Sequence, residues 1–188
     1  MNHLKNSSFE SQAKTYRNKY MNQFISLKCS ADMLAWRLFP NAKEITESFA
    51  CYEATKHLPV NLGDKIVVIV VGDGHTPRTA ATFAMRSRWD TYSVDPNLTR
   101  KWPDLRRVNV CQGEIERWNF SFDRTTIIVL PHAHVLVDTC LKQIQAPERH
   151  VISLQCCVKH NLEIPPCLEY RDSNVWSPEN LIKIWRNV

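Results

Sequence analysis

Two of the four glycines in this 188-residue chain lie in one short turn, where they could admit a ligand. Gly72 and Gly74 directly follow the apolar run of residues 66–71, which is typical of a strand buried on both faces. Because glycine has no Cβ atom, the backbone can approach a ligand that a side chain would block. This turn is therefore the first candidate binding site, and the alternative is a tight strand-to-helix turn that binds nothing.

The residues after the first glycine predict how a helix begins. Thr76 and Pro77 are typical of an N-cap and of the first helical residue, so the N–H groups of the first helical turn would face a ligand. Arg78 falls at the positive end of the helix dipole, which is unfavourable unless an anion lies nearby, either a ligand or Asp73. The candidate cofactor-binding residues of this turn are Gly72, Asp73, Gly74 and Thr76.

An acidic residue ends the second predicted strand, residues 91–94. Asp95 lies 23 residues after Gly72, close to the roughly 20-residue interval at which an acid meets the ribose of a bound nucleoside. A carboxylate can accept hydrogen bonds from both ribose hydroxyls. Asp95 therefore predicts a nucleoside site, and the alternative is an acid that only caps the turn at Pro96 and Asn97.

Two histidines follow the fourth predicted strand, residues 125–130. His132 and His134 come just after Pro131, at the end of the sheet where an acceptor substrate would lie. A neutral imidazole can take a proton from an attacking nitrogen or oxygen near neutral pH. These two histidines are the candidate catalytic residues, and the alternative is that they line a loop and bond to backbone groups.

The seven cysteines are more typical of free thiols than of a disulfide framework. Their number is odd and no apolar leader precedes them, so we expect a reducing compartment, the cytoplasm or the nucleus. Soft metal ligands do gather late in the chain, namely Cys156, Cys157, His160 and Cys167, with His132 and His134. Because no Cys-x-x-Cys pair occurs and adjacent cysteines rarely ligate one ion, we predict no metal site. The longest apolar run has six residues, so no membrane span is expected.

The charge of the chain is mildly basic. There are 24 Lys and Arg residues against 19 Asp and Glu residues. Arg100, Lys101 and Trp102, with Arg106 and Arg107, form a loop that could bind phosphates and stack on a base. The alternative is a solvated charged loop.

The elements that must position these residues divide the chain into two parts. Residues 1–58 contain no glycine and predict a helical N-terminal extension, with a loose arm over the first dozen residues and a helix from Asn41 to His57. Residues 59–188 predict one domain in which strands and helices alternate, which implies parallel strands with right-handed crossovers. Ser177 and Pro178 predict that a short helix ends the chain. The predicted fold is α/β, a Rossmann-like, doubly wound, mostly parallel sheet.

The pattern of these residues resembles the cofactor-binding half of class I S-adenosylmethionine-dependent methyltransferases. The resemblance covers about residues 60–158 and depends on residues 67–74, on Asp95, and on Gln112, Gly113 and Glu114 after the third strand. It implies S-adenosylmethionine as the cofactor, with its methionine part near Gly72 and Gly74 and its ribose on Asp95. It implies that residues 112–114 flank the adenine. The methyl acceptor stays open, and a nucleic acid and a protein are the two candidates.

The chain departs from the family pattern at several positions. Val70 and Val71 stand where the family has an acid before its glycine loop, and residues 130–134 replace the Asp or Asn beside Pro-Pro after strand four. A further strand after the fifth is hard to identify, so the usual antiparallel hairpin is expected to be missing or replaced. Three other functions therefore remain: an inactive Rossmann-fold interaction module, a nicotinamide-dependent oxidoreductase, and a nucleic-acid-binding protein.

Overall fold

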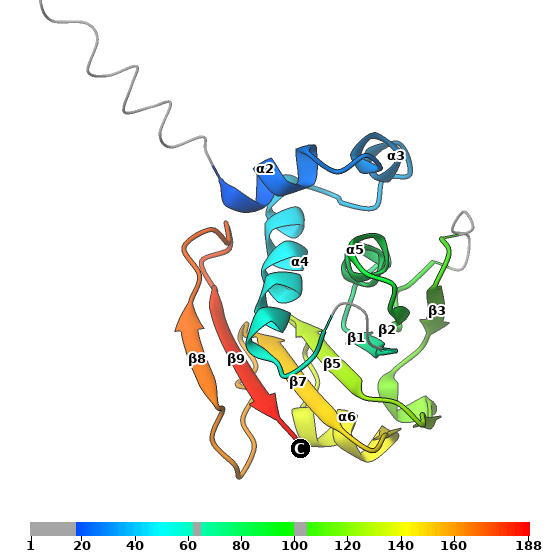
Figure 1. The fold of residues 1–188 in the computed structure, drawn as a ribbon, viewed down its shortest axis with the longest axis vertical. Coiled ribbons are helices and arrows are strands. Elements are labelled where there is room, and N and C mark those ends of the chain that lie inside the picture. Colours follow the sequence, from blue (N-terminus) through cyan, green and yellow to red (C-terminus); the bar gives the residue numbers. More distant parts are fainter. Residues whose placement is uncertain (1–17, 62–64, 100–104) are drawn as a thin grey trace, which may run out of the picture.

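The computed structural model describes residues 18–61, 65–99 and 105–188, and it contains a seven-stranded sheet with helices on its faces (Figure 1). The predicted N-terminal arm and the basic residues Arg100, Lys101 and Trp102 lie outside the described residues. The strand order is β3-β2-β1-β5-β7-β9-β8. The strands of this sheet are β1 (Val67–Val71), β2 (Asp90–Asp95), β3 (Val108–Gln112), β5 (Thr126–Pro131), β7 (Arg149–Leu154), β8 (Leu168–Arg171) and β9 (Leu181–Arg186).

Five adjacent strands of the sheet are parallel, which confirms the predicted Rossmann-like α/β fold. β1 pairs in parallel with β2 and β5, β2 pairs with β3, and β5 pairs with β7. All five residues of β1 are buried, as expected for a central strand covered on both faces. Its alternate side chains enter two apolar cores: Val68 and Val70 on one face, Val67 and Ile69 on the other.

The helices on one face come from both predicted parts of the chain. α4 (Ala42–Ala54) and α5 (Arg78–Arg86) lie side by side over the sheet, and α2 (Lys19–Ile25) packs on α4 (Figure 1). α3 (Ser30–Ala35) follows α2, and a 3-10 helix, η1 (Thr55–His57), ends α4. Asn41 caps α4 by accepting a hydrogen bond from the N–H of Glu44 at 3.1 Å, as predicted. Tyr20, Phe24 and Phe49 share one core with the sheet.

The other face carries smaller elements. They are a 3-10 helix η2 (Ile115–Arg117), helix α6 (Val137–Gln143), and a two-stranded sheet of β4 (Phe120–Ser121) and β6 (Ile144–Gln145). The expected alternation of strand and α-helix is therefore incomplete, since among the described residues only η2 and β4 lie between β3 and β5.

The predicted C-terminal helix is wrong. Residues 181–186 form strand β9, which pairs antiparallel with both β7 and β8. The antiparallel hairpin that was expected to be missing or replaced is therefore present, and it consists of β8 and β9. Ile182 and Ile184 enter one core while Trp185 enters the other, so this segment alternates between the two faces of the sheet as a strand does.

None of the helices in the described ranges has the length and apolar character that crossing a membrane requires.

Candidate functional site

A cavity of about 480 Å³ lies at the carboxyl ends of four parallel strands. Its walls are the ends of β1, β2, β3 and β5 and the loops that follow them, residues 71–72, 94–97, 113–116 and 132–135. The chain runs outward from β1 to β2 and β3 on one side and to β5 and β7 on the other, so the cavity lies where the strand order reverses. This is the place at which open α/β sheets bind ligands.

Six of the ten site residues predicted from the sequence line this cavity. The predicted residues in its wall are Gly72, Asp95, Gly113, Glu114, His132 and His134. Gln112 lines a second, adjacent cavity of about 300 Å³ together with Pro96, Gly113, Glu114 and Arg117. The other three predicted residues, Asp73, Gly74 and Thr76, line neither cavity.

Gly72 allows the loops after β1 and β5 to lie against each other. It has φ +81°, and a Cβ atom at this position would lie 2.8 Å from the Cβ and 2.9 Å from the Cα of Ala133. Ala133 is held in turn by buried His160, whose Nε2 lies 3.0 Å from the Ala133 carbonyl oxygen and whose Nδ1 lies 2.5 Å from Ser153 Oγ. Burial lowers the pKa of His160, which favours the neutral imidazole in this pair of contacts.

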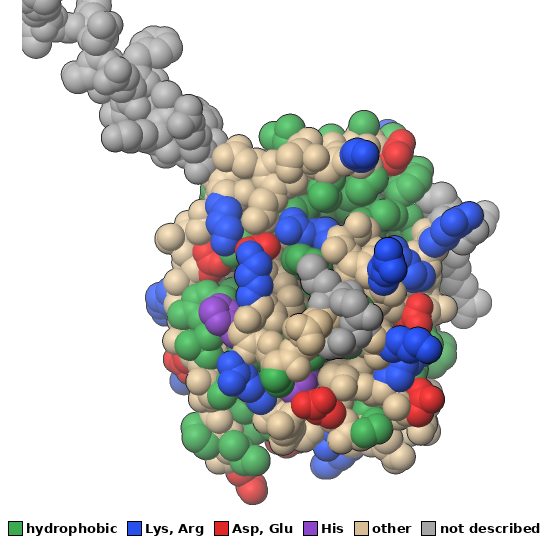
Figure 2. All heavy atoms as spheres, in the orientation of Figure 1, with side chains coloured by type: hydrophobic (Ala, Val, Ile, Leu, Met, Phe, Trp, Pro, Cys, Tyr) green, Lys and Arg blue, Asp and Glu red, His purple; other side chains and the backbone are tan. Residues whose placement is uncertain are grey.

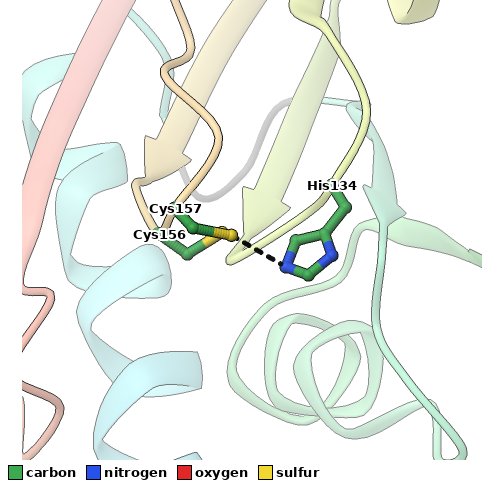
Figure 3. A group of neighbouring side chains, drawn as sticks. All are labelled: His134, Cys156 and Cys157. Carbon is green, nitrogen blue, oxygen red and sulfur yellow. Dashed lines mark hydrogen bonds between the residues drawn. The ribbon is translucent and has the colours of Figure 1, made fainter.

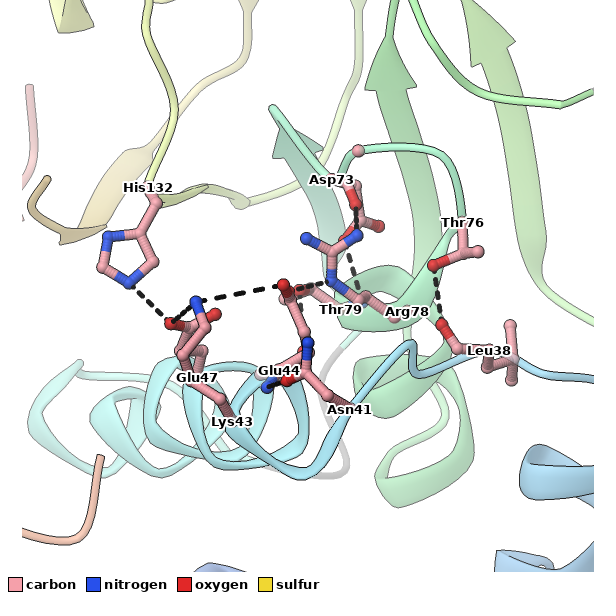
Figure 4. A network of polar contacts seen from close by, with 12 residues as sticks. Leu38, Asn41, Lys43, Glu44, Glu47, Asp73, Thr76, Arg78, Thr79 and His132 are labelled. Atoms are coloured by element: carbon pink, nitrogen blue, oxygen red, sulfur yellow. Dashed lines mark hydrogen bonds and ion pairs between the residues drawn. The ribbon is translucent and has the colours of Figure 1, made fainter. Parts of the chain in front are cut away.

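Asp73, and not Thr76, caps helix α5. The Asp73 carboxylate is buried and accepts hydrogen bonds from the N–H groups of Thr79 at 2.9 Å and Ala80 at 3.1 Å, and from Ser93 Oγ at 2.8 Å. Thr76 instead donates to the carbonyl oxygen of Leu38 at 2.6 Å (Figure 4). Burial raises the pKa of Asp73, although Arg78 and these hydrogen bonds act in the opposite direction. The prediction that helical N–H groups face a ligand therefore fails for Thr79 and Ala80.

The anions that lie near Arg78 are side chains of the protein itself. Its Nε lies 2.6 Å from Glu44 Oε2 of α4, and its guanidinium donates to the backbone carbonyl of Asp73 (Figure 4). The carboxylates of Glu44 and Asp73 offset the cost of a cation at this end of α5.

Asp95 lines the cavity and also holds two loops together. Its Oδ2 accepts a hydrogen bond from the N–H of Gly74 and its Oδ1 accepts one from the N–H of Asn97, each at 2.8 Å. The residue is 8% exposed. A carboxylate has about four acceptor positions, so two bonds to backbone leave room for a pair of ligand hydroxyls. Asp95 therefore caps the turn at Asn97 and lines the cavity at the same time.

His132 contacts a buried carboxylate from a distant part of the chain. Its Nε2 lies 3.0 Å from Glu47 Oε1, and the same oxygen accepts a hydrogen bond from Lys43 Nζ at 2.8 Å (Figure 4). Burial would raise the pKa of Glu47, but the hydrogen bonds from His132 and Lys43 outweigh it and the pKa is lowered. His132 has φ +56°, an unusual backbone conformation for a residue with a side chain.

The sequence analysis missed Glu47. The only local signal was its spacing of four residues from Lys43, which is typical of a pair on a helix surface. Glu47 is instead 4% exposed, because α4 packs over the ends of β5 and β7. Only the fold brings it to His132.

The charged side chains of the cavity wall are mainly acidic. Within the described part of the chain, the wall carries three carboxylates, those of Asp95, Glu114 and Glu116, in addition to His132 and His134. A cavity with this lining attracts cations and repels anions.

The described part of the basic loop has a structural role. Arg107 donates to the carbonyl oxygens of Ser87 at 2.7 Å and Ala84 at 2.6 Å, which are left unpaired at the end of α5. On the face drawn in Figure 2, Lys and Arg side chains are spread over the surface with Asp and Glu side chains between them.

Comparison with known proteins gives matches to solved structures alone. No family model matches the chain, and no curated protein matches it. The chain is similar to the glycopeptide N-methyltransferase MtfA complexed with (S)-adenosyl-L-methionine, at 16% identity and a TM-score of 0.35, over 76% of this chain and 67% of that one. A second MtfA structure has 13% identity and a TM-score of 0.35, over 85% and 82% of the two chains.

A putative O-methyltransferase from Nostoc punctiforme is also similar, at 14% identity and a TM-score of 0.35 over 71% of this chain. The match covers 48% of that protein, so this chain spans about half its length. At this level of similarity the solved structures assign no role to any residue of this chain.

Proposed function

We propose that this chain binds S-adenosylmethionine in the cavity at the carboxyl ends of β1, β2, β3 and β5, and that it is a methyltransferase. The observation that carries the proposal is the position of Asp95 in the wall of a cavity that lies at the reversal point of the sheet. A volume of about 480 Å³ falls within the range of pockets that enclose small-molecule ligands.

The residues around the cavity fit the parts of this cofactor. Asp95 has acceptor positions for the two ribose hydroxyls. Gly72 exposes backbone at the end of β1, where the methionine part is expected. Gly113 and Glu114 belong to the part of the wall where the adenine is expected. Gln112 reaches the same region from the adjacent cavity.

Charge favours this cofactor over a nicotinamide dinucleotide. S-adenosylmethionine supplies an electrophilic methyl group on a positively charged sulfur, which suits the carboxylates of Asp95, Glu114 and Glu116. A dinucleotide would bring a pyrophosphate that needs the N-terminal N–H groups of a helix. In α5 the Asp73 carboxylate takes those of Thr79 and Ala80.

His132 is the residue that we assign to remove the proton from the methyl acceptor. Glu47 pairs with its Nε2, so a proton taken up at Nδ1 would produce an imidazolium beside a carboxylate. A buried carboxylate stabilises an imidazolium and fixes the orientation of the ring. His134, which also lines the cavity, is the second candidate.

Methyl transfer from isotopically labelled S-adenosylmethionine tests this function. Purified protein is incubated with labelled cofactor and with the protein and RNA fractions of the source organism, and we expect label in one of them. His132→Ala should lower the rate by about 100-fold or more, whereas His75→Ala, at an exposed histidine, should not. Binding of the cofactor without any transfer would instead identify an interaction module that retains the pocket.

A further inference from the structure

Three soft ligand atoms lie together at the edge of the cavity, and the two thiols among them have no part in the proposed cofactor site. The Nε2 or Nδ1 atom of His134 and the sulfurs of Cys156 and Cys157 all lie within 4.8 Å of one another. His134 and Cys157 are exposed and Cys156 is half-buried. Figure 3 shows the two thiols and the imidazole facing one another.

The register of the sheet explains why these residues meet. β5 and β7 are neighbouring parallel strands in which Pro131 is paired with Leu154. His134 is the third residue after Pro131, and Cys157 is the third residue after Leu154. The two residues therefore occupy equivalent positions in the loops that follow β5 and β7. His134 Nε2 consequently lies 3.5 Å from Cys157 Sγ.

Adjacent cysteines do not normally share a ligand, because neighbouring side chains of a strand point to opposite faces. Cys156 and Cys157 avoid this geometry, since β7 ends at Leu154 and the two residues lie in the loop that follows. Their sulfurs are 3.7 Å apart and on the same side of the loop (Figure 3). The usual objection to a vicinal pair therefore does not apply here.

Two of the three distances between the ligand atoms match a tetrahedral zinc site, and Cys156 Sγ lies within 4.8 Å of the His134 ring nitrogen. Zn–S and Zn–N distances of about 2.3 Å and 2.05 Å at tetrahedral angles place two sulfurs about 3.8 Å apart and a sulfur and a nitrogen about 3.6 Å apart. The Sγ–Sγ distance of 3.7 Å and the Sγ–Nε2 distance of 3.5 Å agree with these values.

We infer that His134, Cys156 and Cys157 form a site for Zn²⁺ with an open fourth position at the edge of the cavity. On binding, the two thiols lose their protons to solvent and both sulfurs and one imidazole nitrogen become ligands. Cys156 then gives up its present contacts with the carbonyl oxygens of His132 and Ala133, at 3.4 Å and 3.9 Å. Three protein ligands are typical of zinc sites that keep a place for water or substrate.

Metal titration of the full-length protein tests the site directly. Protein freed of metal and kept reduced with a phosphine is titrated with Zn²⁺ against a chromophoric chelator, and with Co²⁺ as a spectroscopic probe. We expect one ion per chain and the thiolate-to-Co²⁺ absorption of a tetrahedral site. The inference is wrong if the protein does not compete with the chelator for Zn²⁺, or if the Co²⁺ spectra lack thiolate bands.

Single substitutions separate this site from binding elsewhere. His134→Ala and Cys157→Ser change exposed side chains, and we expect each to weaken Zn²⁺ binding by more than the roughly 10–100-fold that an outer-shell change costs. Cys167→Ser removes another exposed thiol, whose Sγ lies 3.2 Å from the Ile184 carbonyl, and it should bind Zn²⁺ as wild type does. Equal losses in Cys157→Ser and Cys167→Ser would contradict the assignment. These titrations contain no S-adenosylmethionine, so their outcome is independent of the proposed function.

Discussion

Asp95 accepts hydrogen bonds from two backbone N–H groups and, at the same time, lines the cavity in which we place the cofactor. A single side chain therefore links the stability of the loops after β1 and β2 to ligand binding. An acid that faced only solvent would affect binding alone, and an acid that only capped a turn would affect stability alone. Asp95 is expected to affect both.

Replacing Asp95 should lower both cofactor affinity and stability. In Asp95→Ala the ribose hydroxyls lose a charged acceptor, which should weaken S-adenosylmethionine binding by about 1.5–3 kcal/mol. The N–H groups of Gly74 and Asn97 lose their acceptor as well, at a cost of about 1–3 kcal/mol in the free energy of unfolding. Asp95→Asn should fall between, because an amide oxygen still accepts. Calorimetry and urea unfolding measure the two effects.

The control for Asp95 is Asp123, whose side chain is 95% exposed. Asp123→Ala should leave affinity and stability unchanged. If Asp95→Ala loses stability but binds the cofactor as tightly as wild type, Asp95 has no part in the binding site.

Gly72 is required by its neighbour as well as by its backbone angle. Gly72→Ala should destabilise the fold by more than the roughly 1–2 kcal/mol that a left-handed conformation costs an ordinary residue, because its Cβ would also meet Ala133 at 2.8 Å. Adding Ala133→Gly should recover only the part due to the clash between the two Cβ atoms, because the Cα of residue 133, at 2.9 Å, remains. A urea-unfolding cycle over the two single variants and the double variant gives that coupling, and additive losses would show that the contact does not matter.

At the scale of elements, helix α4 completes a site that the strands begin. It carries Glu47 to His132 and Glu44 to Arg78, and so connects the loop after β5 with the start of α5 (Figure 4). The N-terminal helices are therefore part of the cavity's surroundings, and no local sequence pattern indicated this.

The contacts of Glu47 with Lys43 and His132 should make the free energy of unfolding depend on pH. Because the folded pKa of Glu47 is lowered, its carboxylate contributes stability above the ordinary pKa of 4.5, and this contribution is lost as the pH falls through the lowered value. Glu47→Gln should therefore be less stable than wild type near neutral pH, with the difference disappearing in strong acid. Urea unfolding between about pH 3 and pH 7 measures it. Exposed Glu163→Gln is the control, and a difference independent of pH would count against the pair.

His160 gives a second pH dependence of the same sign at a higher pH. Burial lowers its folded pKa below the ordinary value of 6.5, so below that pH the unfolded chain binds a proton that the folded chain does not. Unfolding free energy should thus fall as the pH drops below 6.5. His160→Gln should make this dependence shallower, whereas His75→Gln, at an exposed position, should not. Buried His150, whose pKa is also lowered by burial, accounts for a remaining slope in the variant.

The sequence was sufficient to predict some strands of the sheet, but it predicted a helix where the last strand lies. The β-branched runs at 65–71 and 125–130 predicted two central strands, which the structure places at Val67–Val71 and Thr126–Pro131, because a continuous apolar run suits burial on both faces. The segment at 181–186 is less apolar because it contains Lys183 and Arg186, and Ser177 and Pro178 before it are typical of a helix start. Short apolar runs fit a helix and a buried strand alike. Pairing with β7 and β8 decided in favour of a strand.

Sequence spacing indicated that several residues share one location more directly than it indicated their contacts. Gly72, Asp95 and His132 line one cavity, since each follows a parallel strand and such strands end at one edge. The cap of α5 was wrong because Asp73 and Thr76 are both typical N-cap residues. The choice between them depends on Ser93 and Leu38, which come from other elements.

At the scale of the whole molecule, the parallel strands, the N-terminal helices and the final hairpin share one core, which fixes the edge of the sheet where the cavity opens (Figure 1). Its wall contains three carboxylates, and the start of α5 is closed to phosphate by Asp73. Both properties favour a positively charged nucleoside ligand over a negatively charged one. Under the proposed function we therefore expect a sulfonium cofactor to bind and a dinucleotide with a pyrophosphate not to bind.

Isothermal titration calorimetry with four nucleosides is the most direct test of this conclusion. The wild-type protein is titrated with S-adenosylmethionine, S-adenosylhomocysteine, NAD and NADP, under conditions that keep its cysteines reduced. We predict binding of both adenosyl compounds with one site per chain, weakened in Asp95→Ala, and no binding of NAD or NADP. Binding of NAD or NADP, or of none of the four compounds, would contradict the account.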